Sequence, residues 1–140
     1  MRILIAGVAL LALSTAGFSQ EAKTQIKKKT IEYTNPSSGS EMYGAYCAVC
    51  HGVDGKGTGP AASALKKTPS NLTLLTKKNN GKFPILAIQA MIQGDNSPSA
   101  HGSRDMPMWG DIFRSVSSSP AVVELRVRNL REYIQSLQEK

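Results

Sequence analysis

The sequence predicts an all-α protein with a single folded domain. Apolar residues near the carboxyl end recur at the three- and four-residue spacing that is typical of an amphipathic helix. They are Val123, Val127, Leu130, Ile134 and Leu137. No segment shows a convincing alternation of apolar and polar residues, which would indicate a β-strand, and 140 residues are about the length of one domain. Two cysteines are too few for a disulfide-dense scaffold, and a net charge of +7 excludes an acidic disordered chain.

The first 19 residues follow the order of a secretory signal peptide. Arg2 supplies a positive charge, an apolar run at 3–13 follows it, and small residues continue as far as Ser19. This run of 11 residues is shorter than the ~20 residues that a membrane-spanning helix needs. We therefore expect residues 1–19 to be a signal peptide and the protein to be exported to the periplasm. A signal that is retained would tether the protein to the membrane.

A polar, basic segment follows at 20–37, with Lys27, Lys28 and Lys29 in its middle and no apolar periodicity. This composition predicts a flexible lead-in. It is either a solvated tail or a segment that associates with an anionic membrane surface. The folded domain is expected at 38–140.

The domain is expected to begin with a helix. Ser38 suits its N-cap position, and Glu41 three residues later completes a capping box, in which each side chain satisfies a free backbone N–H. This helix leads to Cys47. The following segment, 52–60, reads GVDGKGTGP, and its four glycines predict a loop.

The rest of the domain is expected to alternate between short helices and loops. Helices are expected at 61–67, 71–78, 84–93 and from Ser119-Pro120 to Leu137, and an irregular loop is expected at 95–111. Pro84 suits the first position of a helix and Gly94 its end. Met91 lies beside the apolar stripe of this helix, so we expect it in the core.

The segment Cys47-Ala48-Val49-Cys50-His51 is a C-x-x-C-H motif, which is typical of a c-type haem attachment site. Two thiols at this spacing on a helix reach the two vinyl groups of one porphyrin, and the adjacent histidine can ligate its iron. Three other interpretations fit less well. A thioredoxin-like dithiol needs a βαβ pattern, a zinc site usually spaces its histidines as H-x₃₋₅-H, and a plain disulfide leaves His51 unexplained.

A haem iron has a second axial position, for which methionine sulfur is a suitable donor. Met42 is too close to the thiols, on the same helix, to reach the opposite face of a porphyrin. Met106 and Met108 lie in a loop rich in glycine and proline, whose backbone can approach a flat cofactor closely. His101 lies in the same loop. These three residues are the candidates.

With these motifs, the chain resembles the class I bacterial cytochromes c, which hold a single haem between a histidine and a methionine. The resemblance covers about residues 38–138. It implies the cytochrome c fold, with four to five short helices wrapped around one covalently bound haem c. It also implies that His51 and Met106, the methionine before a proline, are the axial ligands and that Trp109 lines the haem pocket. Pro60 resembles the family proline whose carbonyl accepts a hydrogen bond from the proximal histidine.

The resemblance extends to the way in which the first and last helices cross. A glycine and an aromatic residue precede the cysteine motif in that family, and Gly39 and Tyr43 match them. Their partners on the last helix correspond to Leu130 and Tyr133. We therefore expect the N- and C-terminal helices to cross at Gly39.

The function implied is an exported one-electron carrier rather than an enzyme, because an iron held on both faces has no position for a substrate. Partners would be redox proteins such as a dehydrogenase, oxidase or reductase, and lysines would steer docking. These are Lys56, Lys66, Lys67, Lys77, Lys78 and Lys82. The protein would be a monomer or a complex subunit. The alternatives are a haem c electron-entry subunit of an oxidoreductase complex and a five-coordinate haem enzyme or sensor. Nucleic-acid binding is not expected, because the chain carries an export signal and its lysines are scattered.

Overall fold

The computed structural model describes residues 33–95 and 106–140. The chain divides into two units, 1–30 and 31–140. The expected signal peptide and most of the expected lead-in lie outside the described residues, as does His101. The description below therefore concerns the second unit alone. None of the helices described there has the length and apolar character needed to cross a membrane.

All regular structure in the described ranges is helical, as predicted. The elements are α1 (Gly39–Tyr46), α2 (Ala48–His51), the 3₁₀ turn Ala62–Ala64, the 3₁₀ turn Leu72–Leu74, α3 (Leu75–Lys78), α4 (Ile85–Gln93), α5 (Trp109–Val116) and α6 (Pro120–Ser136). Six α-helices are present in these ranges instead of the four to five expected. The difference arises partly because α2 and α3 are single turns of 4 residues each.

The start of α1 is the one predicted, but the capping box is only half formed. The hydroxyl of Ser38 accepts a hydrogen bond from the backbone N–H of Glu41 at 3.2 Å. The Glu41 carboxylate does not reach back to Ser38, because the N–H of Ser38 already donates to the Asn35 carbonyl at 3.0 Å. The Glu41 carboxylate instead accepts a hydrogen bond from the backbone N–H of Asn35, at 3.1 Å.

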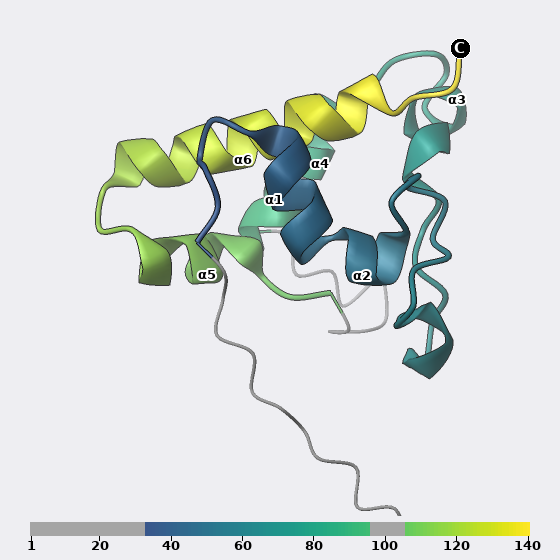
Figure 1. The fold of residues 1–140 in the computed structure, drawn as a ribbon. Helices are drawn as coiled ribbons and strands as arrows, with labels where there is room; N and C mark the ends of the chain where they lie inside the picture. The colour runs from purple at the N-terminus through teal and green to yellow at the C-terminus, as the bar shows by residue number, and fades with distance from the viewer. Residues whose placement is uncertain (1–32, 96–105) are drawn as a thin grey trace, which may run out of the picture. The chain divides into compact units, whose positions relative to one another are not determined.

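Helices α1 and α6 cross at Gly39, as expected from the family resemblance (Figure 1). The Cα of Gly39 lies directly against the backbone carbonyl of Asn129, and a Cβ added there would also lie 2.8 Å from the Cβ of Tyr133. The rings of Tyr43 and Tyr133 pack with their centroids 5.2 Å apart. Leu130 is fully buried at this crossing. Glycine thus permits a close backbone approach that no other residue would allow.

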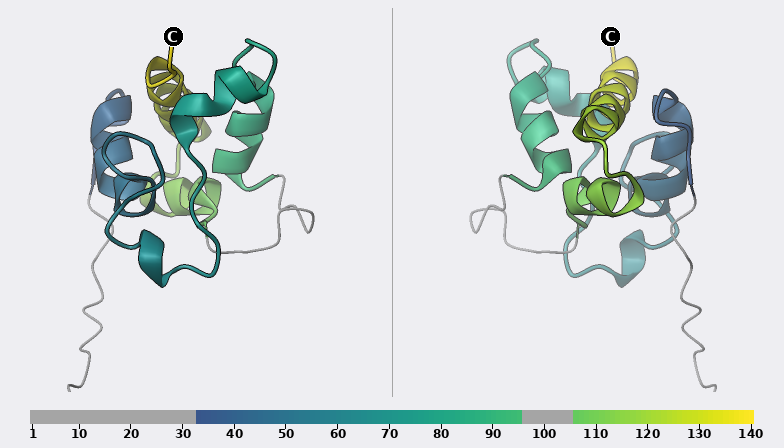
Figure 2. Two further views of the ribbon diagram at one scale, coloured as in Figure 1. Left: turned by 90° about the vertical axis from the view of Figure 1, so that its right-hand side faces the viewer. Right: turned by 90° about the vertical axis from the view of Figure 1, so that its left-hand side faces the viewer.

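Helix α6 is the element around which α1, α4 and α5 pack. Seen along its axis, it has α1 on one side and α4 on the other (Figure 2). The predicted stripe of α6 supplies much of the core, in which Val127, Leu130 and Ile134 are buried. The remaining buried apolar side chains come chiefly from α1, α4 and α5.

Helix α5 corrects the expectation of a loop through residue 111. Its apolar residues Trp109, Ile112, Phe113 and Val116 follow the i, i+3, i+4, i+7 spacing of one helix face. Phe113 is fully buried. The loop that contains Met106 and Pro107 therefore ends where α5 begins, and the packing of α5 on α6 fixes the position of that end of the loop.

Both ends of the unit are attached to it by hydrogen bonds. Residues 33–37 were expected to belong to the lead-in, yet Thr34 is only 2% exposed, and the Pro36 carbonyl accepts from the Asn129 amide at 2.9 Å. At the other end, the Gln138 side chain accepts from the N–H of Thr76 at 2.8 Å and donates to the Leu72 carbonyl at 2.7 Å. The last residues thereby hold the segment that leads into α3.

Candidate functional site

Cys47 stands at the junction of α1 and α2, Cys50 lies within α2, and the two are not joined to each other. Burial raises the pKa of the Cys47 thiol to about 12, and the neighbouring Cys50 adds to the effect. No group of three or more His, Cys, Asp or Glu side chains in the described residues is placed to hold a metal ion. The described residues contain no βαβ unit, which disfavours the dithiol interpretation.

The glycine loop after α2 holds the last turn of that helix in place. The carbonyls of Val49–His51 accept hydrogen bonds from the N–H groups of Ala61, Gly59 and Gly57 at 2.8, 3.0 and 2.7 Å. A Cβ added to Gly59 would lie 2.5 Å from the first of these carbonyl oxygens. The carbonyls left free at the end of a helix are thus satisfied by the loop, and His51 is fixed at a defined position.

The His51 ring is oriented by a hydrogen bond at one of its nitrogens. Nδ1 lies 3.0 Å from the backbone carbonyl of Ser70, and because a carbonyl only accepts, Nδ1 is the nitrogen that carries the proton. Burial lowers the pKa of His51, and this hydrogen bond partly opposes the shift. The neutral ring therefore keeps a lone pair on Nε2. Metal-ligating histidines almost always have this arrangement, with the other nitrogen bonded to a carbonyl, carboxylate or water.

The carbonyl partner of His51 corrects the expectation for Pro60. Pro60 is exposed and does not line the cavity described below, and Ser70 takes the role that was expected for it. The reason is the folding of residues 69–72 onto the glycine loop. The N–H of Leu72 donates to the carbonyl of Gly55 at 2.7 Å, which brings the Ser70 carbonyl against the histidine.

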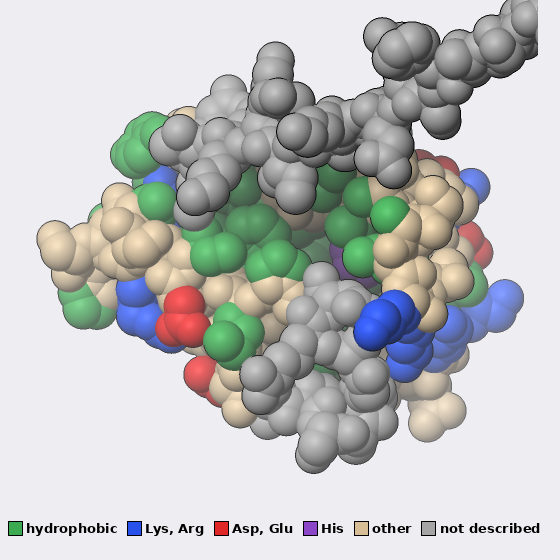
Figure 3. All heavy atoms as spheres, turned by 90° about the horizontal axis from the view of Figure 1, so that it is seen from below, with side chains coloured by type: hydrophobic (Ala, Val, Ile, Leu, Met, Phe, Trp, Pro, Cys, Tyr) green, Lys and Arg blue, Asp and Glu red, His purple; other side chains and the backbone are tan. Residues whose placement is uncertain are grey.

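The cysteines and the histidine line a cavity of about 190 Å³, more than ten times the ~15 Å³ that one ordered water needs. Its wall combines α1 and α2 with segments much later in the chain. The lining residues are Tyr46, Cys47, Cys50, His51, Leu65, Lys67, Thr68, Pro69, Ser70, Met91, Met106, Pro107 and Trp109. Figure 3 shows this face as a hollow lined with apolar side chains, with Lys and Arg side chains along part of its rim.

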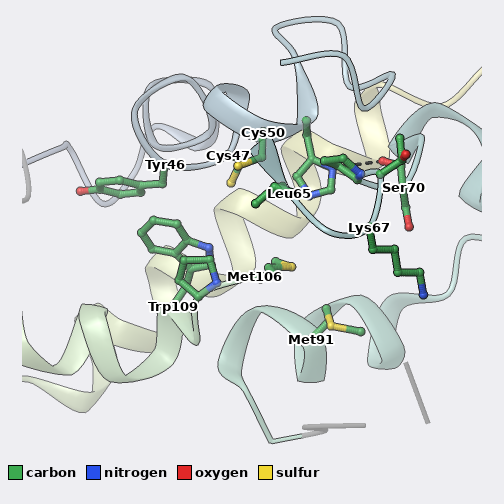
Figure 4. A pocket seen from close by; sticks show the side chains of 13 residues that line it. Tyr46, Cys47, Cys50, Leu65, Lys67, Ser70, Met91, Met106 and Trp109 are labelled. Atoms are coloured by element: carbon green, nitrogen blue, oxygen red, sulfur yellow. Dashed lines mark hydrogen bonds between the residues drawn. The ribbon is translucent and has the colours of Figure 1, made fainter. Parts of the chain in front are cut away.

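Two methionines lie in the cavity wall. Met106 is 36% exposed, and Met91 lies opposite the cysteines (Figure 4). The expectation that Met91 belongs to the core is corrected, because its side chain faces the cavity from α4. Met108 is 50% exposed and does not line the wall; its side chain packs on Gly94, where an added Cβ would lie 2.9 Å from the Met108 Cβ.

Trp109 lies in the cavity wall and is held there by stacking. Its ring centroid lies 5.0 Å from that of Tyr46, with an angle of 28° between the planes. Leu65 and Ser70 were not found from the sequence, since they lie in connecting segments without periodicity or motif. Tyr46 was not found either, because its position in the wall depends on its contact with α5, which lies far along the chain.

The residues present fit a porphyrin. Two thiols stand at one side of a mainly apolar cavity, a neutral imidazole presents a free Nε2, and two thioethers lie in the wall. An all-helical domain with a C-x-x-C-H motif in such a wall defines a protein that carries a covalently attached porphyrin. The family model for cytochrome c matches residues 36–138, and the chain belongs to the cytochrome c family. It binds haem c covalently through its cysteines and is a haem c electron carrier. Neither a curated protein nor a solved structure matches the chain.

Proposed function

We propose that the protein is an exported one-electron carrier between redox proteins, with His51 and Met106 as the axial ligands. The observation that carries this proposal is that both residues line the same cavity as Cys47 and Cys50. When bound, haem c supplies an iron that takes up or releases one electron. Ligation on both faces leaves no position for a substrate, which favours a carrier over an enzyme or a five-coordinate sensor.

The chain contributes a rigid setting for this chemistry. The bond from His51 to the Ser70 carbonyl fixes the plane of the imidazole ring. The stacked rings of Tyr46 and Trp109 form one side of the cavity wall. Because these groups are held by backbone and by packing, little reorganisation is needed when the charge at the site changes.

The lysines that were expected to steer docking are exposed in the structure, and Lys67 also lines the cavity. They are Lys56, Lys66, Lys67, Lys77, Lys78 and Lys82. Positive charge at the rim of a cavity attracts a partner whose docking face is acidic and raises the association rate at low salt. We expect a transient complex that buries less than ~1,200 Å² in total.

Optical spectra of three methionine variants test the ligand assignment. The oxidised wild type should show the Met–iron charge-transfer band, and Met106→Ala should abolish it. Met108→Ala is the matched control, two positions away, and should keep the band. Met91→Ala should keep it as well, since Met91 is assigned to the wall alone.

Other outcomes would change the assignment. Loss of the band in Met91→Ala alone would transfer the ligand role to that residue, and an unchanged low-spin spectrum in Met106→Ala would bring Met108 or His101 forward. Rapid binding of carbon monoxide by the wild type would contradict six-coordination and favour the enzyme or sensor.

Export and assembly are tested on the protein from its own cells. A mature chain that begins near residue 20 in the periplasmic fraction supports a cleaved signal peptide, whereas recovery in the membrane fraction with residues 1–19 intact supports a retained anchor. Sizing of the native protein separates a free monomer from a subunit of an oxidoreductase complex.

A further inference from the structure

Arg126, on α6, is a buried cation without a carboxylate partner among the described residues. It is the largest fully buried side chain in the part of the chain that the structure describes, with an exposed fraction of 0%. Its two terminal nitrogens donate to the hydroxyl and the backbone carbonyl of Thr34, at 2.9 and 2.8 Å, and its Nε has no hydrogen-bond partner within 33–95 and 106–140. Because a guanidinium keeps its proton at all accessible pH values, a full positive charge lies inside the domain.

Stability alone gives no reason for this charge. The guanidinium lies over the rings of Tyr33 and Phe113, with 5.3 and 5.8 Å to the centroids, and these contacts partly compensate its removal from water. Buried ionic groups are nevertheless often replaceable by apolar residues of similar volume without loss of stability. A charge at this position therefore indicates an electrostatic role.

The charge is connected to the cavity in two ways. The Thr34 hydroxyl that accepts from Arg126 is also hydrogen-bonded to the Tyr46 hydroxyl at 2.9 Å, and Tyr46 is part of the cavity wall. The ring of Phe113 contacts both Arg126, at 5.8 Å from its centroid, and Trp109 of the wall, at 6.1 Å between centroids. The guanidinium is thus linked to the cavity wall by hydrogen bonds through Thr34 and by ring contacts through Phe113. Charges in such an interior are screened far less than charges in water.

We propose that Arg126 raises the reduction potential of the redox group held in the cavity, a role that rests on the proposed function as a one-electron carrier. Reduction adds one electron and so removes one unit of positive charge from the site. A fixed cation nearby favours the state with less positive charge, which is the reduced state. Arg126 is thus a positioning residue, because its charge acts on the site from a distance and its hydrogen bond to Thr34 connects it to Tyr46 in the wall.

The test is an equilibrium redox titration of the holoprotein with Arg126→Met, which keeps most of the apolar volume and removes the charge. We expect the equilibrium constant for reduction to fall about tenfold, which corresponds to ~59 mV for one electron. Arg126→Lys keeps the charge and should stay within a factor of two of the wild type. Val127→Ala, at the next fully buried position of α6, reports the effect of loosened packing alone and should also stay within a factor of two.

Several results would overturn the role of Arg126. One is a reduction constant for Arg126→Met within twofold of the wild type; another is an equal fall in Val127→Ala. Arg126→Gln provides a second charge-free variant, whose amide can still donate to Thr34. If neither charge-free variant folds around its haem, Arg126 is a stability residue and the proposal is wrong. A wild type without reversible one-electron reduction defeats the proposed function itself, whereas reversible reduction at unchanged potential in both variants defeats only this inference.

Discussion

Replacing Gly39 by alanine should destabilise the crossing of α1 and α6 far more than one methyl group normally does. The new Cβ would collide with the backbone carbonyl of Asn129 and lie 2.8 Å from the Cβ of Tyr133. Neither neighbour can rotate away, because one is backbone and the other is the root of a side chain. The two helices must therefore separate, which also disturbs the packing of Tyr43 on Tyr133.

The size of this effect follows from two opposing contributions. Overpacking of a close contact costs about 1–3 kcal/mol, and a backbone collision belongs at the upper end. Alanine is the better helix former and returns up to about 1 kcal/mol. A net loss of about 2 kcal/mol in the free energy of unfolding lowers the melting temperature of a domain of this size by about 10 °C, taking ~2.1 cal/mol/K per residue for the entropy of unfolding.

Thermal unfolding of the holoprotein, followed by circular dichroism, measures this change, and Gly44→Ala is its control. Gly44 lies on the same helix, and nothing lies within 4 Å of a Cβ added there. This variant should gain up to about 1 kcal/mol from helix propensity and melt above the wild type. If Gly39→Ala melts at or above the wild-type temperature, the close approach of the helices at this residue is not as described.

Two further predictions concern the carboxyl end and alkaline pH. Gln138→Ala removes the side chain that accepts from the N–H of Thr76, and it should lower the free energy of unfolding, measured in urea titrations, by about 1–2 kcal/mol. The control is Gln135→Ala, whose side chain is exposed nearby; it should change the free energy of unfolding by less than ~0.5 kcal/mol. Tyr43 donates to the Gly52 carbonyl at 2.8 Å, and burial, with smaller effects from nearby groups, raises its pKa from 10.0 to about 12. As the pH rises, the tyrosine of the unfolded chain loses its proton before that of the folded chain. The contribution of Tyr43 to the free energy of unfolding is therefore fully present below pH ~10 and falls by about 2 kcal/mol between pH ~10 and ~12. A Tyr43→Phe variant that shows the same loss at alkaline pH would contradict this assignment.

Local signals in the sequence were sufficient for most of the helices, because they depend on neighbouring residues. Ser38 caps α1 as its spacing from Glu41 predicts, and Gly94 ends α4 in the left-handed conformation, with φ of 84°, that glycine adopts without strain. The sequence also contains a signal for α5, which is the four-residue spacing of Trp109 and Phe113. It was hidden by its position directly after a loop rich in glycine and proline.

Contacts between distant segments account for what the sequence did not predict. Nothing near His51 indicates that the carbonyl of Ser70 will lie against its ring, since that depends on how residues 69–72 fold onto the glycine loop. Arg126 has a weak signal of its own: it lies three residues after Val123 and four before Leu130, inside the apolar stripe. A charged residue in such a stripe indicates a buried cation, but its partner, Thr34, is 92 positions away.

The crossing of the first and last helices also decides when the Cys47 side chain becomes buried. Asn129, whose carbonyl lies against Gly39, follows Cys47 by 82 residues. A contact between segments so far apart in the chain closes a long loop and therefore forms late in folding. Until α6 docks, the surface that buries α1 is absent, and Cys47 is more accessible than in the folded domain, where it is buried. Docking of the last helix ends that period of accessibility.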